Sequence, residues 1–457
     1  MMESLRLSQL FPCMPARLVG DDVSFAAVST DTRNVKPGNL FVALSGERFN
    51  GNSFVVQAEE KGACAAIVSE LQDVNIPQLL VRDTVQALGW LGHLNRSRSA
   101  AKVVAVTGSQ GKTTVKELTG AILSRRFNTL ITRGNLNNSI GAPQMLLELD
   151  ASHERAVIEL GANAQGEIAW GTRITNPEIV LLNNAAETHV EGFAGLQGII
   201  KGKGEIIDSA PATHTVILNA DDSHVGIWQK RAGDRRVVLF SGAGSADADY
   251  RAEAVELLAD GSRFDLVDAK GRVSCFLPLA GCHNISNAVA AAALAIEAGA
   301  SLIDVRDALA AVKAVSGRLK PIPGMAGSQL IDDTYNASPA SFRAAINVLC
   351  QISQSQSLRS ILIAGDMAEL GDISDRAHIE LGRYAREMGI DQLWCTGKFS
   401  ELTAEGFGEG AWHFNSKDAL TRHAVNTLDA GMVVLVKGSR SAAMEEVVEK
   451  IRSGDNR

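Results

Sequence analysis

The sequence predicts an α/β protein made of three units, and three observations lead to that prediction. The chain has 457 residues, which at about 150 residues per domain corresponds to roughly three domains. Apolar segments of strand length alternate with segments of helix length along most of the chain, as in parallel sheets covered by helices on both faces. Glycine is frequent, at 42 residues, and aromatic residues make up 5%, which suits tight strand-to-helix turns better than a β-sandwich.

Composition and charge disfavour several classes of function. The chain carries 44 basic and 52 acidic side chains, and this net charge of −8 argues against bulk binding to nucleic acid or to an anionic membrane surface. The longest apolar runs are far shorter than the roughly 20 residues that cross a bilayer. The N-terminus lacks the pattern of a secretory signal. The six cysteines are scattered without a Cys-x-x-Cys pair, so we expect no disulfide framework, no zinc site and a cytoplasmic location.

The first predicted unit, residues 1–98, is a small α/β domain. Apolar runs that follow turn residues predict three strands, at 39–44, 63–68 and 78–81. Leucines at helical spacing predict a helix at 84–95. The small, polar segment 96–102 marks the first expected domain boundary.

The second unit, residues 99–315, has the clearest alternation of strands and helices. Buried strands are predicted at 103–106, 156–160, 179–182, 216–218 and 237–240. Between 250 and 278 apolar and polar residues alternate around two turns, which predicts a small antiparallel insert. The apolar, alanine-rich segment 284–298 predicts a buried helix.

The third unit, residues 316–457, repeats the parallel pattern as a separate, Rossmann-like α/β domain. Strands are predicted at 330–333, 360–364, 392–395 and 432–436. The polar segment 351–357 is expected to be a short loop.

The strongest motif lies at 103–114, where a buried strand runs into a glycine-bearing loop and then a helix. Such a loop lets backbone N–H groups close around phosphate oxygens at a helix N-terminus. Lys112 is expected to bind the β- and γ-phosphates, and the Thr113 hydroxyl to bind Mg²⁺. Val106 stands where the longer G-x-x-x-x-G-K-[ST] pattern has its first glycine, so this is the shorter G-x-x-G-K-T form. The motif predicts ATP binding by Gly108, Ser109, Gln110, Gly111, Lys112, Thr113 and Thr114.

Further polar residues follow other predicted strands. In open α/β sheets, ligands bind beyond the carboxyl ends of the strands, where Glu159 and His189 are expected. Taken alone, a glutamate or a histidine in such a position is more often solvated or structural. Asn284 also suits a helix N-cap, and Lys201 and Lys203 also suit a solvated surface.

The chain resembles the Mur ligases of bacterial peptidoglycan synthesis over essentially its whole length. In the first unit the similar segments are 29–33, 37–44 and 46–51. In the central unit they are 107–114, 135–141, 159–163, 189–193 and 281–287. In the third unit they are 317–319, 332–337, 365–371 and 436–440. The last three of these are most similar to the members that join D-alanyl-D-alanine to UDP-N-acetylmuramoyl-tripeptide.

The resemblance implies roles for individual residues. It places the first Mg²⁺ on Thr113 and a second on Glu159 and His189, and implies that a lysine shortly after the histidine is carbamylated. Lys203 fits that spacing better than Lys201. Nucleotide contacts are implied for Asn287, Arg318 and Asp333. Substrate contacts are implied for Thr30, Asp31, Thr32, Arg33, Gly46, Arg48, Asn138, Asn336 and Ser338, the last two near the dipeptide.

The reaction implied by the resemblance is ATP-dependent amide formation. A substrate carboxylate attacks the γ-phosphate of ATP to give an acyl phosphate, and an amine then displaces phosphate. Lys112 and Mg²⁺ offset the repulsion between the two anions. The first unit would hold the UDP-sugar, the second ATP and the third the dipeptide, with closure of the units about a hinge before Gly317.

Partners and alternatives follow from the same resemblance. We expect small-molecule substrates, no nucleic acid, no membrane insertion and a monomer. One rival function is a folylpolyglutamate-type ligase, which lacks a UDP-binding first domain, and another is a regulatory P-loop ATPase. The third residue of the tripeptide, diaminopimelate or lysine, stays open.

Overall fold

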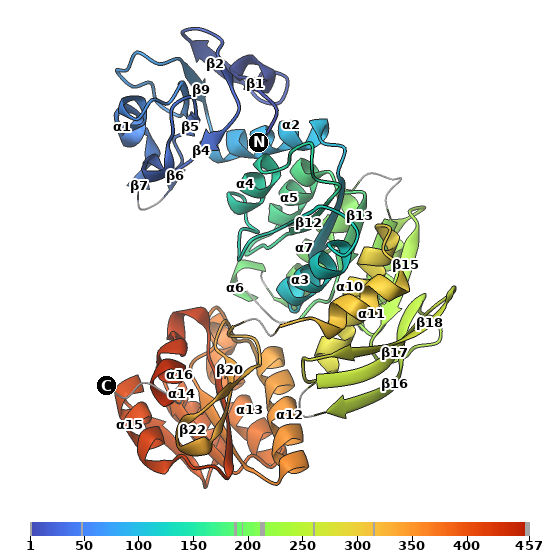
Figure 1. The fold of residues 1–457 in the computed structure, drawn as a ribbon. Helices are drawn as coiled ribbons and strands as arrows, with labels where there is room; N and C mark the ends of the chain where they lie inside the picture. The colour runs from blue at the N-terminus through green and yellow to red at the C-terminus, as the bar shows by residue number, and fades with distance from the viewer. Residues whose placement is uncertain are drawn as a thin grey trace.

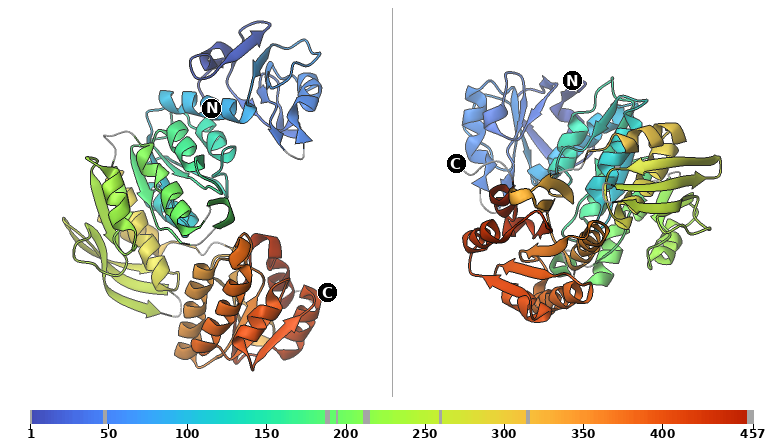
Figure 2. Two further views of the ribbon diagram at one scale, coloured as in Figure 1. Left: turned by 180° about the vertical axis from the view of Figure 1, so that it is seen from behind. Right: turned by 60° about the horizontal axis from the view of Figure 1, so that its bottom comes forward.

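The computed structural model describes residues 2–46, 49–186, 190–193, 195–210, 215–258, 261–313 and 316–452. Its three large sheets have five, nine and six strands and follow one another along the chain. Figure 1 and the left view of Figure 2 show the first and third units at opposite ends of the central one. The predicted α/β class and three-part architecture are confirmed.

The first unit is built around a sheet with the strand order β2-β9-β8-β5-β4. The strands are β2 Ala16–Val19, β4 Val28–Ser29, β5 Leu40–Val42, β8 Ala65–Val68 and β9 Gln78–Val81. The three predicted strands are β5, β8 and β9, whereas β2 and β4 were not predicted. Around the sheet lie β1 Leu5–Arg6, β3 Ser24–Phe25, β6 Ser45–Gly46, β7 Phe49–Asn50, and the helices α1 Val55–Glu60 and α2 Thr84–Arg98.

Helix α2 joins the first unit to the central one. The Asp83 carboxylate accepts hydrogen bonds from two backbone N–H groups and so begins the helix. The helix runs to Arg98, past the expected end at 95, so the predicted boundary segment begins inside a helix. Arg96 is only 5% exposed, and its guanidinium binds the Glu178 carboxylate at 2.7 Å in the central unit. The start of the boundary segment is therefore packed against the central unit.

The central sheet has the order β11-β12-β10-β13-β14-β15-β16-β17-β18. Its strands are β10 Lys102–Thr107, β11 Thr129–Ile131, β12 Arg155–Glu159, β13 Ile179–Leu182, β14 Thr215–Asn219, β15 Val237–Ser241, β16 Tyr250–Leu258, β17 Gly261–Asp268 and β18 Gly271–Leu277. All pairs from β11 to β16 are parallel, and β16-β17-β18 are antiparallel. The predicted antiparallel strands are confirmed, but they extend the main sheet because β16 pairs with β15.

Helices cover both faces of the central sheet. They are α3 Lys112–Leu123, α4 Gly141–Leu147, α5 Glu167–Thr175, α6 Val190–Phe193, α7 Leu196–Lys203, α8 Glu205–Asp208, α9 Val225–Ala232, α10 Cys282–Glu297 and α11 Leu302–Ala310. Along β10, Val104 and Val106 pack into one apolar core and Val103 and Ala105 into another. Strand β10 is therefore buried on both faces, which fixes the position of the loop that follows it.

The third unit has a six-stranded sheet with the order β19-β20-β24-β21-β22-β23, parallel except for β19. The strands are β19 Lys320–Pro323, β20 Gln329–Asp333, β21 Arg359–Ala364, β22 Gln392–Thr396, β23 Ala411–Phe414 and β24 Met432–Lys437. The helices are α12 Pro339–Gln356, α13 Ser374–Glu387, α14 Ser400–Phe407, α15 Lys417–Thr427 and α16 Glu445–Ile451. None of the helices in the described ranges combines the length and the apolar character that crossing a bilayer requires.

The prediction of a loop at 351–357 is wrong. Helix α12 continues to Gln356, because Ile352 is buried in the core while the polar residues around it face outward. Ser357 ends the helix in a left-handed conformation, with φ +54°.

Candidate active site

A cavity of about 1180 Å³ lies between the central and third units. Its walls come from the carboxyl ends of parallel strands in both sheets, which is where ligands bind in open α/β folds. The glycine-bearing loop after β10 and Glu159 at the end of β12 line one side. Asp333 at the end of β20 and Lys437 at the end of β24 line the other.

Two consecutive asparagines hold the loop that follows β10. The Asn184 side chain accepts a hydrogen bond from the Gln110 backbone N–H at 2.8 Å, and Asn183 Nδ2 donates to the Gln110 carbonyl at 2.9 Å. Gly111 has a φ of +75°, and a Cβ there would overlap the side chains of Asn287 and Asn183. The turn into α3 therefore requires glycine both for its conformation and for space.

Lys112 is the first residue of α3, and its side chain folds back over the loop. Its ammonium donates to the carbonyl oxygens of Gly108 at 2.6 Å and Ser109 at 3.2 Å. Burial lowers the pKa of Lys112, while Glu159 opposes that effect. The ammonium is thus held at the cavity wall beside the loop's N–H groups, as a phosphate site needs.

Glu159 has the features of a cation ligand. It is 1% exposed, and its Oε1 accepts from Asn137 Nδ2 at 2.7 Å and from the Thr113 hydroxyl at 3.3 Å. Its Oε2 is buried and has no hydrogen-bond partner among the described residues. A buried carboxylate oxygen without a partner, next to a hydroxyl, is a donor set that fits Mg²⁺, which prefers oxygen ligands.

Lys203 and Lys201 differ sharply in their surroundings. Lys203 is 1% exposed, with its ammonium 3.4 Å from the Ala162 carbonyl oxygen. Burial lowers the pKa of Lys203 to about 7, and the positive charge of Lys112 acts in the same direction. Lys201 is exposed. A buried lysine amine that is readily neutral suits the predicted carbamylation at 203 and not at 201. His189 lies outside the described residues.

The third unit contacts the phosphate loop directly. Arg318 Nη2 donates to the Thr113 hydroxyl at 3.0 Å, and its guanidinium lies 4.2 Å from the centre of the Tyr335 ring. Gln110 Nε2 donates to the Ser338 hydroxyl at 3.1 Å. These contacts join two residues predicted to bind ATP, Thr113 and Gln110, to the third unit: Arg318 was predicted to bind the nucleotide and Ser338 to lie near the dipeptide.

Five further predicted residues line the cavity, whereas Gly108 and Lys203 are not among its lining residues. Asn287 Oδ1 accepts from Asn183 at 3.1 Å, and Asn138 Oδ1 caps the start of α4 by accepting from the Gly141 N–H at 2.8 Å. Ser338 caps α12. Asn336 accepts through its backbone oxygen from the Lys437 ammonium at 2.8 Å. Thr114 lies beside the loop on α3.

The residues predicted in the first unit do not line this cavity. Thr30 accepts from Gln144 of α4 at 3.0 Å, and Thr32 is 8% exposed and donates to Gln57. Arg33 pairs with Asp31 at 2.6 Å and lowers the pKa of that carboxyl to about 2. Gly46 lies on β6, and Arg48 lies outside the described residues.

Models of the Mur ligase family match each of the three units. The Mur ligase family, catalytic domain, matches residues 24–98, the Mur ligase middle domain matches residues 106–295, and the Mur ligase, glutamate ligase domain, matches residues 317–440. Together they cover most of the chain. The chain belongs to the Mur ligase family.

Individual relatives resemble this Mur ligase along most of its length. The UDP-N-acetylmuramoyl-tripeptide–D-alanyl-D-alanine ligase of Escherichia coli K12 is 47% identical, over 99% of both chains. A crystal structure of MurF from Acinetobacter baumannii has a TM-score of 0.91 at 37% identity, covering 98% of both chains. The MurF ligase of Thermotoga maritima, solved with ADP, has a TM-score of 0.82 at 25% identity, covering 93% of this chain and 96% of that one.

Several residues that shape the site of this Mur ligase were not predicted individually. Asn183 and Asn184 hold the phosphate loop, Asn137 binds Glu159, and Lys437 forms a buried 2.7 Å ion pair with Asp333. Asn183, Asn184 and Lys437 end or directly follow a parallel strand, so strand-end position was the available signal. Their partners lie on other strands, and the sequence does not show which strands are neighbours.

Proposed function

We propose that this Mur ligase joins D-alanyl-D-alanine to UDP-N-acetylmuramoyl-tripeptide and converts ATP to ADP and phosphate. The observation that carries the proposal is the shared cavity, where a phosphate loop and a buried carboxylate face the strand ends of a second α/β unit. The Escherichia coli relative, 47% identical, is named for this reaction. The Thermotoga maritima structure was solved with ADP, which agrees with a nucleotide product.

The central unit binds ATP. The segment from Gly108 to Thr114 surrounds the phosphates with backbone N–H groups, and the Lys112 ammonium leaves its carbonyl partners to bind phosphate oxygens. Thr113 would hold one Mg²⁺, and Glu159, His189 and carbamylated Lys203 would hold another. When bound, Mg²⁺ offsets the negative charge of the phosphates.

The third unit completes the nucleotide site and receives the dipeptide. Asn287 of the central unit and Arg318 and Asp333 of the third contact the nucleotide. The hydrogen bond from Arg318 to the Thr113 hydroxyl supports this role, because a positive charge beside the phosphate loop would stabilise negative charge that develops on the transferred phosphoryl group. Asn336 and Ser338 lie near the dipeptide, and Asn138 contacts the tripeptide.

The proposed reaction has two steps, phosphoryl transfer to a carboxylate and then formation of the amide bond. The terminal carboxylate of the tripeptide attacks the γ-phosphorus, which forms an acyl phosphate and releases ADP. The amine of D-alanyl-D-alanine then attacks the acyl carbon, loses a proton and displaces phosphate. Closure of the units around the cavity excludes water, which would otherwise hydrolyse the acyl phosphate.

The domain assignment follows the three sheets. Residues 1–98 bind the UDP-sugar through Thr30, Asp31, Thr32, Arg33, Gly46 and Arg48. Residues 99–315 bind ATP, and residues 316–457 bind the dipeptide and one side of the nucleotide. The protein acts as a monomer in the cytoplasm, where ATP is available and its six free cysteines stay reduced.

Phosphate release measured with each substrate omitted in turn tests the proposal. The ligase releases phosphate only when ATP, the UDP-linked tripeptide and D-alanyl-D-alanine are all present. Release from ATP alone would instead indicate a regulatory ATPase, and release driven by a folate and glutamate would indicate a folylpolyglutamate-type ligase. Separate assays with diaminopimelate- and lysine-containing tripeptides identify the third residue.

A further inference from the structure

The segment after β21 forms part of the cavity wall in the third unit. Ala368, Glu369 and Leu370 line the cavity, whereas Met367 is buried at 1% exposure. Glu369 has a φ of +61°, a left-handed conformation that residues other than glycine seldom adopt. The contacts of the neighbouring residues Asp366 and Met367 show how the segment is attached to the rest of the unit.

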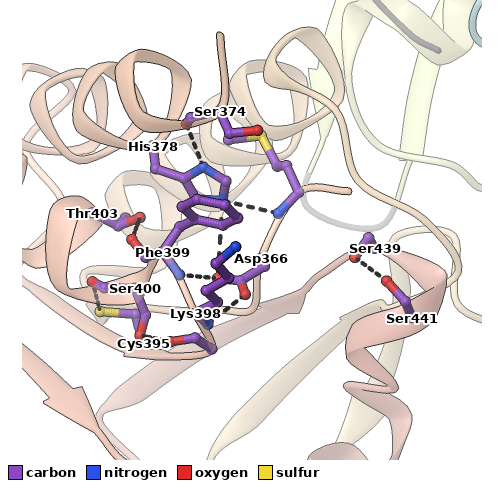
Figure 3. Close-up of polar contacts among 12 residues, drawn as sticks. Asp366, Ser374, His378, Cys395, Lys398, Phe399, Ser400, Thr403, Ser439 and Ser441 are labelled. Atoms are coloured by element: carbon purple, nitrogen blue, oxygen red, sulfur yellow. Dashed lines mark hydrogen bonds and ion pairs between the residues drawn. The ribbon is translucent and has the colours of Figure 1, made fainter. Parts of the chain in front are cut away.

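Asp366 ties three strand-end loops together. Its carboxylate accepts from the backbone N–H groups of Lys398 at 2.6 Å and Phe399 at 3.1 Å, both in the loop after β22. Its backbone oxygen accepts from the Ser439 N–H at 2.9 Å, in the turn after β24. Ser439 and Ser441 of that turn also line the cavity, and their hydroxyls lie 3.2 Å apart. Figure 3 shows the contacts of the Asp366 carboxylate with Lys398 and Phe399, and the pair of hydroxyls of Ser439 and Ser441.

His378 holds the same segment from the other side. It lies on α13, is 1% exposed, and stacks on the Phe399 ring with centroids 4.9 Å apart (Figure 3). Its Nε2 accepts from the Met367 N–H at 3.0 Å, and its Nδ1 lies 2.7 Å from the Ser374 carbonyl oxygen. A carbonyl can only accept and an N–H can only donate, so the ring is neutral with its proton on Nδ1. Burial also lowers the pKa of His378.

We propose that Asp366 and His378 are positioning residues for the incoming dipeptide. Together they hold the segment 367–370 and the turn 439–441 as one wall of the dipeptide pocket. The proposal rests on the ligase function proposed above. Glu369 and Arg440 also line this wall, and the Arg440 guanidinium pairs with the Glu445 carboxylate at 2.8 Å. A wall with side chains of both signs suits a zwitterion, which has an amine at one end and a carboxylate at the other.

Steady-state kinetics with two His378 variants test the proposal. In His378→Leu the buried Met367 N–H loses its acceptor, and we expect the KM for D-alanyl-D-alanine to rise by about 5- to 100-fold. The KM values for ATP and the UDP-linked tripeptide stay unchanged. In His378→Gln the side-chain oxygen again accepts from Met367, so most of the wild-type KM returns. His423→Leu, on the opposite face of the same sheet, is the matched control and behaves as wild type.

The kinetic outcomes separate this proposal from the ligase function. An unchanged dipeptide KM in His378→Leu, or an equal rise in all three KM values, overturns the positioning role alone. If phosphate release by the wild-type protein does not depend on the dipeptide, the ligase function itself is overturned. If His378→Leu fails to fold, Asp366→Asn replaces it, because the amide keeps one acceptor oxygen and the same selective rise in KM is expected.

The pH dependence of the dipeptide KM is a second test. A histidine that only stabilised the fold would not change this dependence. As the pH falls through the lowered pKa of His378, Nε2 gains a proton and can no longer accept from Met367, so the dipeptide KM rises. The charged groups around the ring are Asp366, 4.0 Å from Nε2, Asp375 on the same helix, and Lys398, whose ammonium lies over the Phe399 ring. His378→Gln keeps all three and lacks the imidazole, so its acid rise disappears. The same rise in both proteins overturns the proposal.

Discussion

At the scale of single residues, the site separates groups that carry charge from groups that hold them in place. Lys112 and Glu159 face the cavity with opposite charges, and each is held by neighbours that are themselves neutral. Glu159 Oε2 has no hydrogen-bond partner among the described residues, and the Lys112 ammonium donates to two carbonyl oxygens. On the proposed function, both groups would gain stronger partners when a metal–nucleotide complex binds.

Replacing Lys112 with alanine tests the phosphate loop. Lys112→Ala removes a charge preorganised toward the developing anion, so we expect kcat to fall by roughly 10²–10³-fold. The fold survives, because glycines and the two asparagines shape the loop backbone. Turnover and thermal unfolding are measured beside Lys102→Ala, at the opposite end of β10, which keeps wild-type activity. Full activity in a folded Lys112→Ala protein removes the assignment.

The choice between two lysines is tested by chemical rescue. Lys203→Ala loses the carboxylate that a carbamate would supply, so activity falls sharply and partly returns with millimolar acetate or formate. The matched control, Lys201→Ala, changes an exposed side chain two residues away on the same helix and has a mild effect. If Lys201→Ala loses activity and Lys203→Ala does not, the carbamylated residue is Lys201. If neither variant loses activity, the protein has no functional carbamate at these positions.

At the scale of elements, the turn between β10 and α3 combines a left-handed glycine with a close approach. Gly111→Ala strains φ and pushes a Cβ into Asn287 and Asn183, so the loop shifts and the KM for ATP rises strongly. Gly233→Ala is the matched control, because Gly233 has a φ of +58° with no atom near its missing Cβ. Gly233→Ala therefore strains the backbone without a steric collision. Equal KM values for ATP in the two variants would show that the collision has no effect.

Apolar patterns within single segments predicted most of the helices and strands. They carried less information about which strands pair with one another. The apolar strands at β10, β12, β13 and β24 stand out because they are buried on both faces. Strands β11 and β23 are short edges, and β19 carries two prolines, which an edge strand tolerates, so they left little pattern. The polar end of α12 looked like a loop because one buried residue, Ile352, held it to the core.

The candidate site shows the same limit. The phosphate loop is a contiguous motif and was predicted residue by residue. Asn183 donates a hydrogen bond to a loop more than 70 residues away in the sequence. Lys437 forms an ion pair with Asp333 across the β20–β24 pair. Such roles depend on which strands are neighbours.

At the scale of the whole molecule, the first unit contacts the central one through α2, and the third unit contacts the phosphate loop through Arg318. Ligands that bridge the units favour closure, since each contributes contacts from more than one domain. We expect small-angle scattering to show a smaller radius of gyration when the UDP-linked tripeptide and a non-hydrolysable ATP analogue bind together. An unchanged profile with both sites saturated would argue against closure.

An isotope label on one substrate oxygen tests whether the reaction passes through an acyl phosphate. The tripeptide's terminal carboxylate is labelled with ¹⁸O, and the released phosphate is analysed by mass spectrometry after ligation to D-alanyl-D-alanine. An acyl phosphate carries one carboxylate oxygen to phosphorus, so we expect one ¹⁸O in the phosphate for each amide bond formed. Unlabelled phosphate accompanying full ligation would contradict it.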